Sequence, residues 1–342
     1  MNIVFTICSN NYLSYAALLA FSTKKHNPNI TFVIGLVDEI DNNSDYSFLG
    51  DVLLLPVKDI GLLNLDELWK KYTIVELNTS VKASYFKYLF NHFTEAREIL
   101  YIDPDIFVYQ SLSPLFKYLE KDDIILTPHV LTPIPLDGES PSENFFLNYG
   151  IFNLGFIGLN RNCYSNNGFL DWWEERIHEL GFIKLDLGLF TDQLWINFAS
   201  IYFDKVKIIR DLGCNVARWN LHERNVILDK NSIYRMNDNS PLYFFHFSSY
   251  KYNSPNVMSK YYTRYNFETH PLVKKLYDAY REGLILNKVE YWSMIPCVYV
   301  TKRANYLNNL PQDNISFISK VNQFIKRLLP PIVLDLKYSL FK

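Results

Sequence analysis

Residues 99–108 read Ile-Leu-Tyr-Ile-Asp-Pro-Asp-Ile-Phe-Val, an apolar run that carries two carboxylates one residue apart. Buried strands are apolar throughout, so Asp103 and Asp105 are expected either where the strand leaves the core or where a partner neutralises them. Residues i and i+2 of an extended chain lie on the same face, and two anions held that close repel unless a cation lies between them. The pair therefore indicates a site for a divalent cation such as Mn²⁺ or Mg²⁺, which prefers oxygen ligands. A plain Asp-Pro-Asp turn is the alternative, and the strand-like flanks on both sides argue against it.

The composition is that of a large folded protein. The chain has 342 residues, of which 49% are hydrophobic and 20% charged, and these values exclude a disordered protein. Aromatic residues make up 16% of the chain, a share that fits clefts that stack bases or sugar rings as well as a densely packed core. A formal net charge of −2 provides no general attraction for nucleic acid, so no nucleic-acid partner is expected.

Cysteine usage and the N-terminal sequence indicate a cytoplasmic protein. The four cysteines lie far apart, without a Cys-x-x-Cys pair or a histidine at ligand spacing, so neither a zinc site nor a disulfide framework is expected. The first residues contain no basic segment followed by a cleavage site. No apolar run reaches the roughly 18–20 residues that a transmembrane helix requires.

Strand-like and helix-like segments alternate over about the first 110 residues, which predicts a mostly parallel α/β sheet flanked by helices. Such sheets bind ligands at the carboxyl ends of their strands, where the acidic pair falls. The second half adds helices, strands and a Pro- and Ser-rich loop at 128–143, which is either a mobile active-site element or a surface excursion. The expected strands are 3–7, 30–37, 52–55, 99–102, 123–127, 148–159, 206–209 and 241–248, and the expected helices are 13–25, 65–72, 81–91, 115–120, 169–180 and 191–201.

The C-terminal segment differs in charge from the rest of the chain. Residues 302–342 contain seven Lys or Arg and two Asp, which gives a net charge of +5. Within it, residues 317–332 mix apolar and basic side chains, as in segments that lie on an anionic membrane surface. The sequence therefore predicts a peripheral contact with the inner face of the cell membrane. Docking of this segment on the protein's own core is the alternative.

Four segments, taken in order, carry a family resemblance. They are the acidic pair at 103–105, a Gly-spaced strand at 153–158, an expected helix start at 191–195 and an aromatic strand at 244–249. This ordered set resembles the GT-A class of nucleotide-sugar glycosyltransferases. It is most similar to the retaining group that includes glycogenin and bacterial lipopolysaccharide galactosyltransferases, over roughly residues 1–255.

The resemblance implies a role for each matching residue. Asp103 and Asp105 match the Asp-x-Asp metal motif, and His246 is the implied third metal ligand. Asn153 looks like the residue that faces the donor sugar, and Asp192 with Gln193 resembles the pair beside the reacting sugar. Each residue also has a plain structural reading: Asn153 in a turn, Asp192 at a helix N-terminus, and His246 in a hydrogen-bonded core.

The match to the family is incomplete after His246. The family motif continues with a glycine and then a lysine six residues past the histidine. Ser249 stands at the glycine position here, and Tyr252 stands at the lysine position. Lys251, one residue earlier, is the candidate for contact with the donor diphosphate.

Further donor contacts are expected at the ends of the first two strands and at the start of one helix. The family places base and ribose contacts where Thr6, Asn10 and Asp38 stand. Lys82, at the start of the helix expected at 81–91, resembles a basic residue that neutralises the donor, with a solvated helix lysine as the alternative.

Two aromatic pairs also attract attention. Arg218 and Trp219 lie in a loop and either line the acceptor cleft or pack in the core, since tryptophan stacks well on sugars. Asp171, Trp172 and Trp173 lie on an expected helix and are predicted to belong to the core rather than to a site.

The resemblance implies a metal-dependent hexosyltransferase that uses a nucleotide-diphosphate sugar, with UDP as the expected nucleotide. The implied reaction is transfer with retention to a surface glycan, a lipopolysaccharide or another glycoconjugate, including lipid-linked acceptors. The implied domains are a GT-A catalytic domain over 1–260 and a helical basic extension over 261–342. Within the catalytic domain, 1–115 is the nucleotide-binding half and 116–260 the acceptor and metal half.

Two other functions remain open. A nucleotidyltransferase shares the parallel sheet and metal carboxylates, but residues 5–15 contain no glycine for a phosphate loop. A non-catalytic module that binds nucleotide sugars is the second alternative.

Overall fold

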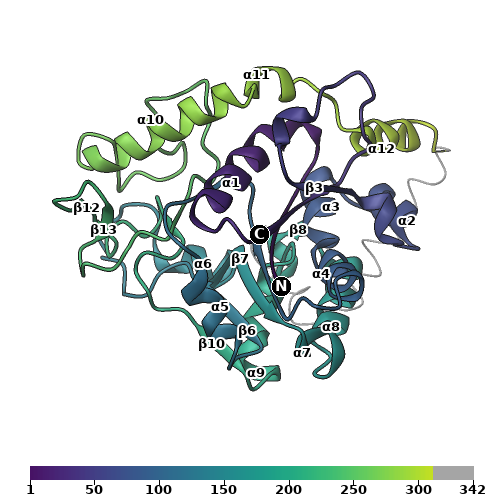
Figure 1. Cartoon of the computed structure of the whole chain (residues 1–342), viewed down its shortest axis with the longest axis horizontal. Coiled ribbons are helices and arrows are strands. Elements are labelled where there is room, and N and C mark those ends of the chain that lie inside the picture. The colour runs from purple at the N-terminus through teal and green to yellow at the C-terminus, as the bar shows by residue number, and fades with distance from the viewer. Residues whose placement is uncertain (311–342) are drawn as a thin grey trace, which may run out of the picture.

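A seven-stranded central sheet organises the protein in the computed structural model, which describes residues 1–310 (Figure 1). The strand order is β10-β6-β7-β4-β1-β2-β3, and all neighbours are parallel except β7, which runs antiparallel to β4 and β6. The expected α/β fold with a mostly parallel sheet is therefore confirmed. The strands are β1 (Asn2–Cys8), β2 (Thr31–Leu36), β3 (Leu53–Pro56), β4 (Glu98–Ile102), β6 (Ile124–Pro128), β7 (Phe152–Asn160) and β10 (Val206–Ile208).

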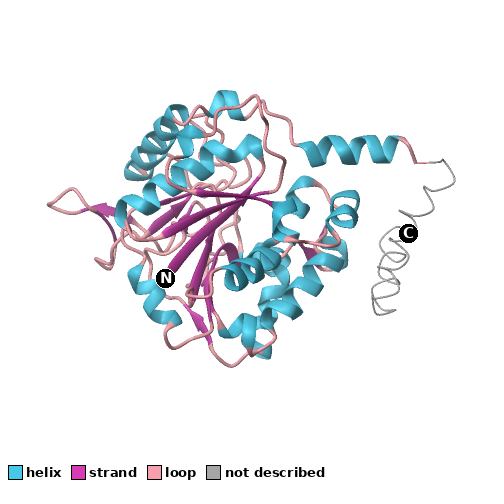
Figure 2. Ribbon diagram, turned by 45° about the vertical axis from the view of Figure 1, so that its right-hand side comes forward, coloured by secondary structure: helices cyan, strands magenta, loops and turns pink. Residues whose placement is uncertain are grey.

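Helices cover both faces of this sheet (Figure 2). Side chains alternate along β1, so Phe5 packs into one core and Val4 into the other. The first core includes residues of α3 (Ile74–Ser80), α4 (Lys82–His92) and α8 (Phe169–Leu180). The second core includes residues of α1 (Leu13–His26) and α5 (Ser113–Leu119).

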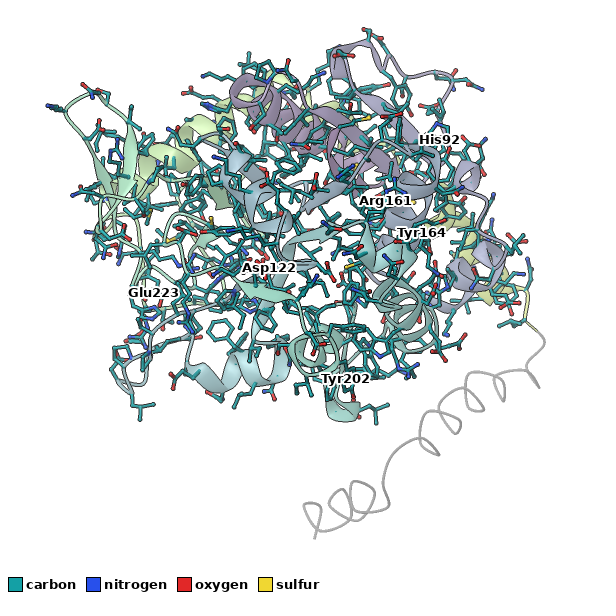
Figure 3. The ribbon with its side chains drawn as sticks, turned by 60° about the horizontal axis from the view of Figure 1, so that its bottom comes forward. His92, Asp122, Arg161, Tyr164, Tyr202 and Glu223 are labelled. Carbon is teal, nitrogen blue, oxygen red and sulfur yellow. The ribbon has the colours of Figure 1, made fainter. Side chains whose placement is uncertain are left out.

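Hydrogen bonds from the residues after β7 hold the C-terminal end of this strand to α4. Arg161 donates to the carbonyls of Phe93 (2.7 Å) and Ala96 (2.8 Å), just after α4. The hydroxyl of Tyr164 donates to Asn91 near the end of that helix (3.3 Å), and Figure 3 shows Arg161 and Tyr164 near His92. These bonds tie α4 to the strand on which part of the pocket is built.

A small second sheet brings distant segments together. Its strands are β11 (Val216–Ala217), β14 (Phe244–His246) and β5 (Ile106–Val108), in that order. β14 is parallel to β11, with His246 opposite Ala217, and antiparallel to β5, with His246 opposite Ile106. The residues before β5, at the end of β14 and after β11 therefore meet at one edge of this sheet.

The C-terminal helices of the described chain pack on the same body. They are α10 (Pro271–Leu286), α11 (Val289–Trp292) and α12 (Val298–Asn308). On α10, Tyr280 stacks on Phe247 at 3.9 Å between ring centroids. Residues on both sides of position 260 therefore share one hydrophobic core.

The predicted membrane-surface segment at 317–332 lies outside the described residues. Among residues 1–310, no helix combines the length and the apolar character needed to cross a bilayer.

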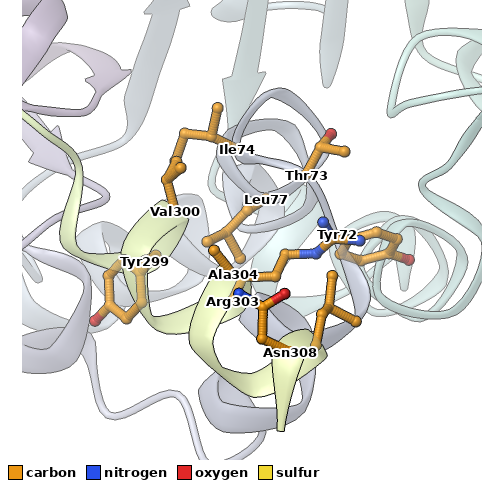
Figure 4. A pocket seen from close by; sticks show the side chains of 10 residues that line it. Tyr72, Thr73, Ile74, Leu77, Tyr299, Val300, Arg303, Ala304 and Asn308 are labelled. Carbon is orange, nitrogen blue, oxygen red and sulfur yellow. The ribbon is translucent and has the colours of Figure 1, made fainter. Parts of the chain in front are cut away.

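Helix α12 borders α3 across a groove, shown in Figure 4 with its lining side chains.

Two expected elements differ from the structure, one in its start and one in its continuity. The strand expected at 148–159 begins only at Phe152, because helix α6 (Glu143–Tyr149) precedes it. The helix expected at 191–201 is broken: Thr191 has a positive φ of 46°, and a 3₁₀ helix (Leu194–Phe198) and α9 (Ala199–Tyr202) follow. A helix cannot start at Thr191, because its backbone is left-handed and its N–H donates to the carbonyl of Phe182 (3.1 Å).

The remaining α-helices and strands of the described residues are short. They are the helices α2 (Leu65–Lys71) and α7 (Asn162–Ser165) and the strands β8 (Ile183–Lys184), β9 (Leu189–Phe190), β12 (Val226–Leu228) and β13 (Tyr234–Met236).

Candidate functional site

The three predicted metal ligands meet at the edge of one pocket, which has a volume of about 540 Å³. Asp103 follows β4, Asp105 precedes β5 and His246 ends β14. His246 Nε2 lies 3.0 Å from Asp105 Oδ1 and 3.9 Å from Asp103 Oδ2, and ligand atoms of the three residues lie within 4.8 Å of one another. Two carboxylates and one imidazole fit Mn²⁺ or Mg²⁺.

The protonation properties of these groups reflect their mutual contact. Burial raises the pKa of the Asp103 carboxyl. Burial also acts to raise the pKa of Asp105, but the charge of His246 outweighs it and leaves this pKa below its ordinary value. Burial acts to lower the pKa of His246, and the neighbouring Asp105 and Asp103 reverse this, so the pKa of His246 lies above 6.5. The carboxylates of Asp103 and Asp105 thus favour a positive charge between them.

Metal binding is expected to depend on pH because the imidazole must lose its proton to become a ligand. As the pH falls through the pKa of His246, which lies above its ordinary 6.5, Mn²⁺ affinity is expected to fall by about tenfold per pH unit. Isothermal titration at pH 6, 7 and 8 measures this slope. In the variant His246→Gln the slope should flatten, and an equally steep slope there would contradict the assignment.

Behind the metal ligands lies a chain of buried amides. Asn215 Oδ1 lies 3.3 Å from His246 Nδ1, and Asn215 Nδ2 donates to Asn153 Oδ1 at 2.9 Å. Asn153 Nδ2 lies 3.2 Å from Nε2 of His129, whose pKa burial lowers to about 3, so this imidazole is neutral and accepts the bond. The chain orients the His246 ring. Asn153 and His129 also line the pocket. His129 and Asn215 were not predicted as site residues, because no sequence motif marks them.

Gly155 leaves room for the imidazole. A Cβ atom at this position would lie 2.5 Å from His246 Cε1, closer than side chains tolerate. We expect Gly155→Ala to displace His246 and weaken Mn²⁺ binding by about 10–100-fold, as measured by titration calorimetry. Gly158→Ala is the matched control on β7, because its Cβ would meet only core side chains such as Leu100. Equal metal affinity in the two variants would contradict this role.

A buried ion pair forms another part of the wall. Lys82 Nζ lies 2.5 Å from Asp192 Oδ2, and the two side chains are 2% and 3% exposed. Lys82 also donates to the carbonyl of Leu154 (3.0 Å) and lies 4.0 Å from the ring centroid of Tyr101. The reading of Lys82 as a solvated helix lysine is therefore wrong. The reading of Asp192 as an N-terminal helix residue is also wrong, because no α-helix begins there.

Gln193 fixes the backbone around the pocket. Its Oε1 accepts from the Leu154 N–H (2.9 Å), and its Nε2 donates to the carbonyl of Tyr149 (2.8 Å). Gln193 therefore joins the start of β7 to the end of α6, which supplies aromatic side chains to the pocket.

The two aromatic pairs noted in the sequence differ in placement. Arg218 and Trp219 are buried and line the pocket, and the ring of Trp219 meets His246 edge-on at 5.2 Å. Trp173 is fully buried on α8, which confirms the core reading, while the neighbouring Asp171 forms an ion pair with Lys87.

The residues expected to hold the nucleotide lie outside this pocket lining. The backbone N–H of Asn10 donates a hydrogen bond to the Asp38 carboxylate (3.2 Å). The same carboxylate accepts a hydrogen bond from the N–H of Val298, the first residue of α12 (2.8 Å). Thr6 is fully buried in β1. Lys251 is exposed, and it is not among the residues that line the pocket.

The position that the family fills with glycine keeps a glycine-like backbone. Ser249 lines the pocket and has a φ of +58°, in the left-handed region that side chains disfavour. The loop therefore retains the turn that a glycine would favour, although the side chain differs.

Known proteins share parts of this chain. Residues 2–191 match the sequence profile of Glycosyl transferase family 8. Two uncharacterised proteins of Bacillus subtilis (strain 168), YfnF and YfnD, are 27% and 23% identical over 199 and 180 residues, or 58% and 52% of this chain. The matched regions span 64% and 55% of those proteins, less than two thirds of either. The crystal structure of the galactosyltransferase LgtC with donor and acceptor sugar analogues is 17% identical, with a TM-score of 0.47 over 82% of this chain and 95% of that one.

The profile match includes the predicted Asp-x-Asp pair, Asn153 and Lys82, and it spans more than half of the 342 residues. It confirms the resemblance inferred from the four motifs. The chain belongs to glycosyl transferase family 8.

Proposed function

We propose that this protein is a metal-dependent hexosyltransferase that takes its sugar from a nucleotide-diphosphate donor. The donor is UDP-linked in this proposal, and the acceptor is a surface glycan, a lipopolysaccharide or another glycoconjugate. The observation that carries the proposal is the convergence of Asp103, Asp105 and His246 at the edge of a pocket that also contains the Lys82–Asp192 pair. Family membership supports glycosyl transfer as the reaction.

The chemistry divides between the leaving group and the sugar. A divalent ion held by Asp103, Asp105 and His246 would neutralise the charge that grows on the diphosphate as the bond to the sugar breaks. In this proposal Asp192 binds donor-sugar hydroxyls or stabilises positive charge at the reacting carbon, and Lys82 holds its carboxylate at the pocket. Asn153 contributes a polar contact to the sugar from the same wall.

Aromatic side chains in the pocket lining suit an acceptor sugar. They include Phe145, Tyr149, Phe190 and Tyr262, and the Gln193 side chain donates to the carbonyl of Tyr149. Retention of the anomeric configuration follows from the family resemblance. Nucleotide contacts at Thr6, Asn10 and Asp38, and contact of the basic tail with the inner face of the membrane, remain part of the proposal.

Ligand-induced stabilisation tests the proposal before any acceptor is known. Thermal unfolding is followed with UDP-glucose, UDP-galactose, UDP-N-acetylglucosamine and GDP-mannose, each with Mn²⁺ and with EDTA. A donor present at 100 times its dissociation constant should stabilise the fold by about 2.7 kcal/mol, and only when the metal is present. If no nucleotide sugar raises the melting temperature with Mn²⁺, the proposal is wrong.

A further inference from the structure

A buried cation, Arg218, lies near the metal ligands, and its charge acts to lower the pKa of Asp105. Arg218 is 5% exposed, and among residues 1–310 it forms no ion pair with a carboxylate. Its Nε is buried without a hydrogen-bond partner. Burial of an unpaired charge is costly unless an anion completes the site.

The second sheet fixes where this cation lies. Arg218 follows directly on β11, whose last residue, Ala217, is opposite His246 in β14. His246 is in turn opposite Ile106, the residue after Asp105. The backbone register therefore puts Arg218 at the edge of the sheet that carries two of the three metal ligands.

The surroundings of the guanidinium group direct it into the pocket. It lies 4.8 Å from the ring centroid of Tyr262, which lines the pocket with it. Ser248 and Ser249, from the loop after β14, line the same pocket. The aromatic ring supports the cation without neutralising it.

Formal charges show why such a cation is needed. The carboxylates of Asp103 and Asp105 balance the two charges of a divalent ion. Lys82, the other Lys or Arg in the lining, is paired with Asp192. Without a further cation, the metal-loaded pocket would have no net positive charge with which to meet a diphosphate.

We propose that Arg218 binds the diphosphate of the donor, which is the role that the sequence analysis predicted for Lys251. The proposal rests on the proposed function and names the residue that completes its leaving-group site. Arginine suits the task because its planar fork of donors matches phosphate oxygens. Lys251 is exposed and is not in the pocket lining, and Tyr252, which stands at the family's lysine position, carries no positive charge.

Binding of UDP, UMP and uridine, each with Mn²⁺, tests the assignment by titration calorimetry. In Arg218→Gln, UDP affinity is expected to fall by about 10–100-fold, UMP affinity by less, and uridine affinity by no more than about twofold. Arg218→Lys should recover part of the loss, and the loss should exceed that in Lys251→Gln. Arg210→Gln, at an exposed arginine outside the pocket, is the matched control.

The outcomes separate the two proposals. If the wild type binds none of UDP, GDP, CDP and ADP with Mn²⁺, the proposed function fails. If it binds a nucleoside diphosphate and Arg218→Gln binds it as tightly, the assignment of Arg218 is overturned and the proposed function stands. Equal losses for UDP and uridine, or a lowered melting temperature that accounts for the loss, would reduce Arg218 to a structural residue and also overturn the assignment.

Discussion

Turnover of Asp105→Asn is expected to fall by about 10²–10³-fold, the largest loss from any single carboxylate in the protein. Asparagine keeps the size of the side chain but removes the negative charge that, with Asp103 and His246, attracts a divalent ion. Mn²⁺ affinity should fall in parallel, because the remaining ligands are one carboxylate and one imidazole. Release of the nucleotide from the donor sugar measures turnover, and calorimetry measures metal binding.

The control for this variant is Asp204→Asn, at an exposed aspartate that does not line the pocket. It should keep wild-type turnover and Mn²⁺ affinity. Near-wild-type turnover in Asp105→Asn at low Mn²⁺ concentration would show that Asp105 is not a ligand. Unchanged metal-free melting of both variants would exclude unfolding as the cause of any loss.

Lys82→Met is expected to lower the free energy of unfolding by about 3–5 kcal/mol, because it leaves the buried carboxylate of Asp192 without its partner. Asp192→Asn should destabilise the fold for the same reason. The double variant Lys82→Met/Asp192→Asn should lose less than the sum of the two single losses, because neither charge is then left unpaired. Urea unfolding at neutral pH measures all three values.

Lys87→Met provides the matched control on the same helix. Lys87 also forms ion pairs, with Glu174 (2.5 Å) and Asp171 (2.6 Å), but its side chain is 25% exposed. Loss of an exposed pair costs about 0–1 kcal/mol. If Lys82→Met lowered the free energy of unfolding no more than Lys87→Met, water would compensate the charge of Asp192. The Lys82–Asp192 pair would then not stabilise the fold as a buried ion pair.

The central sheet was predictable because its strands carry a clear pattern. The run at 99–102 is apolar and ends at the acidic pair, and the structure places that pair at the carboxyl end of β4. The helix expected at 169–180 matches α8 residue for residue, because its apolar side chains recur at helical spacing. The helix expected at 191–201 is interrupted at Thr191, whose backbone is left-handed and whose N–H donates to the carbonyl of Phe182, a contact that local periodicity does not encode.

The second sheet was harder to predict because two- and three-residue strands have no measurable periodicity. β11 and β5 are stabilised by pairing with β14, a contact between segments more than 100 residues apart in the case of β5. For the same reason the sequence did not predict the role proposed for Arg218, because the position of this residue depends on that pairing. His129 and Asn215 became visible only through their bonds to Asn153 and His246.

Metal-dependent sugar transfer is tested by nucleotide release from a panel of nucleotide sugars, with Mn²⁺ and after its removal by EDTA. We expect the wild type to hydrolyse or transfer at least one donor, with UDP donors foremost, in the presence of Mn²⁺. EDTA should abolish this release, renewed Mn²⁺ should restore it, and Asp105→Asn should show a loss of about 10²–10³-fold. Release that persists at the same rate in EDTA, or equally in Asp105→Asn, would show that the reaction does not depend on a metal held by Asp105.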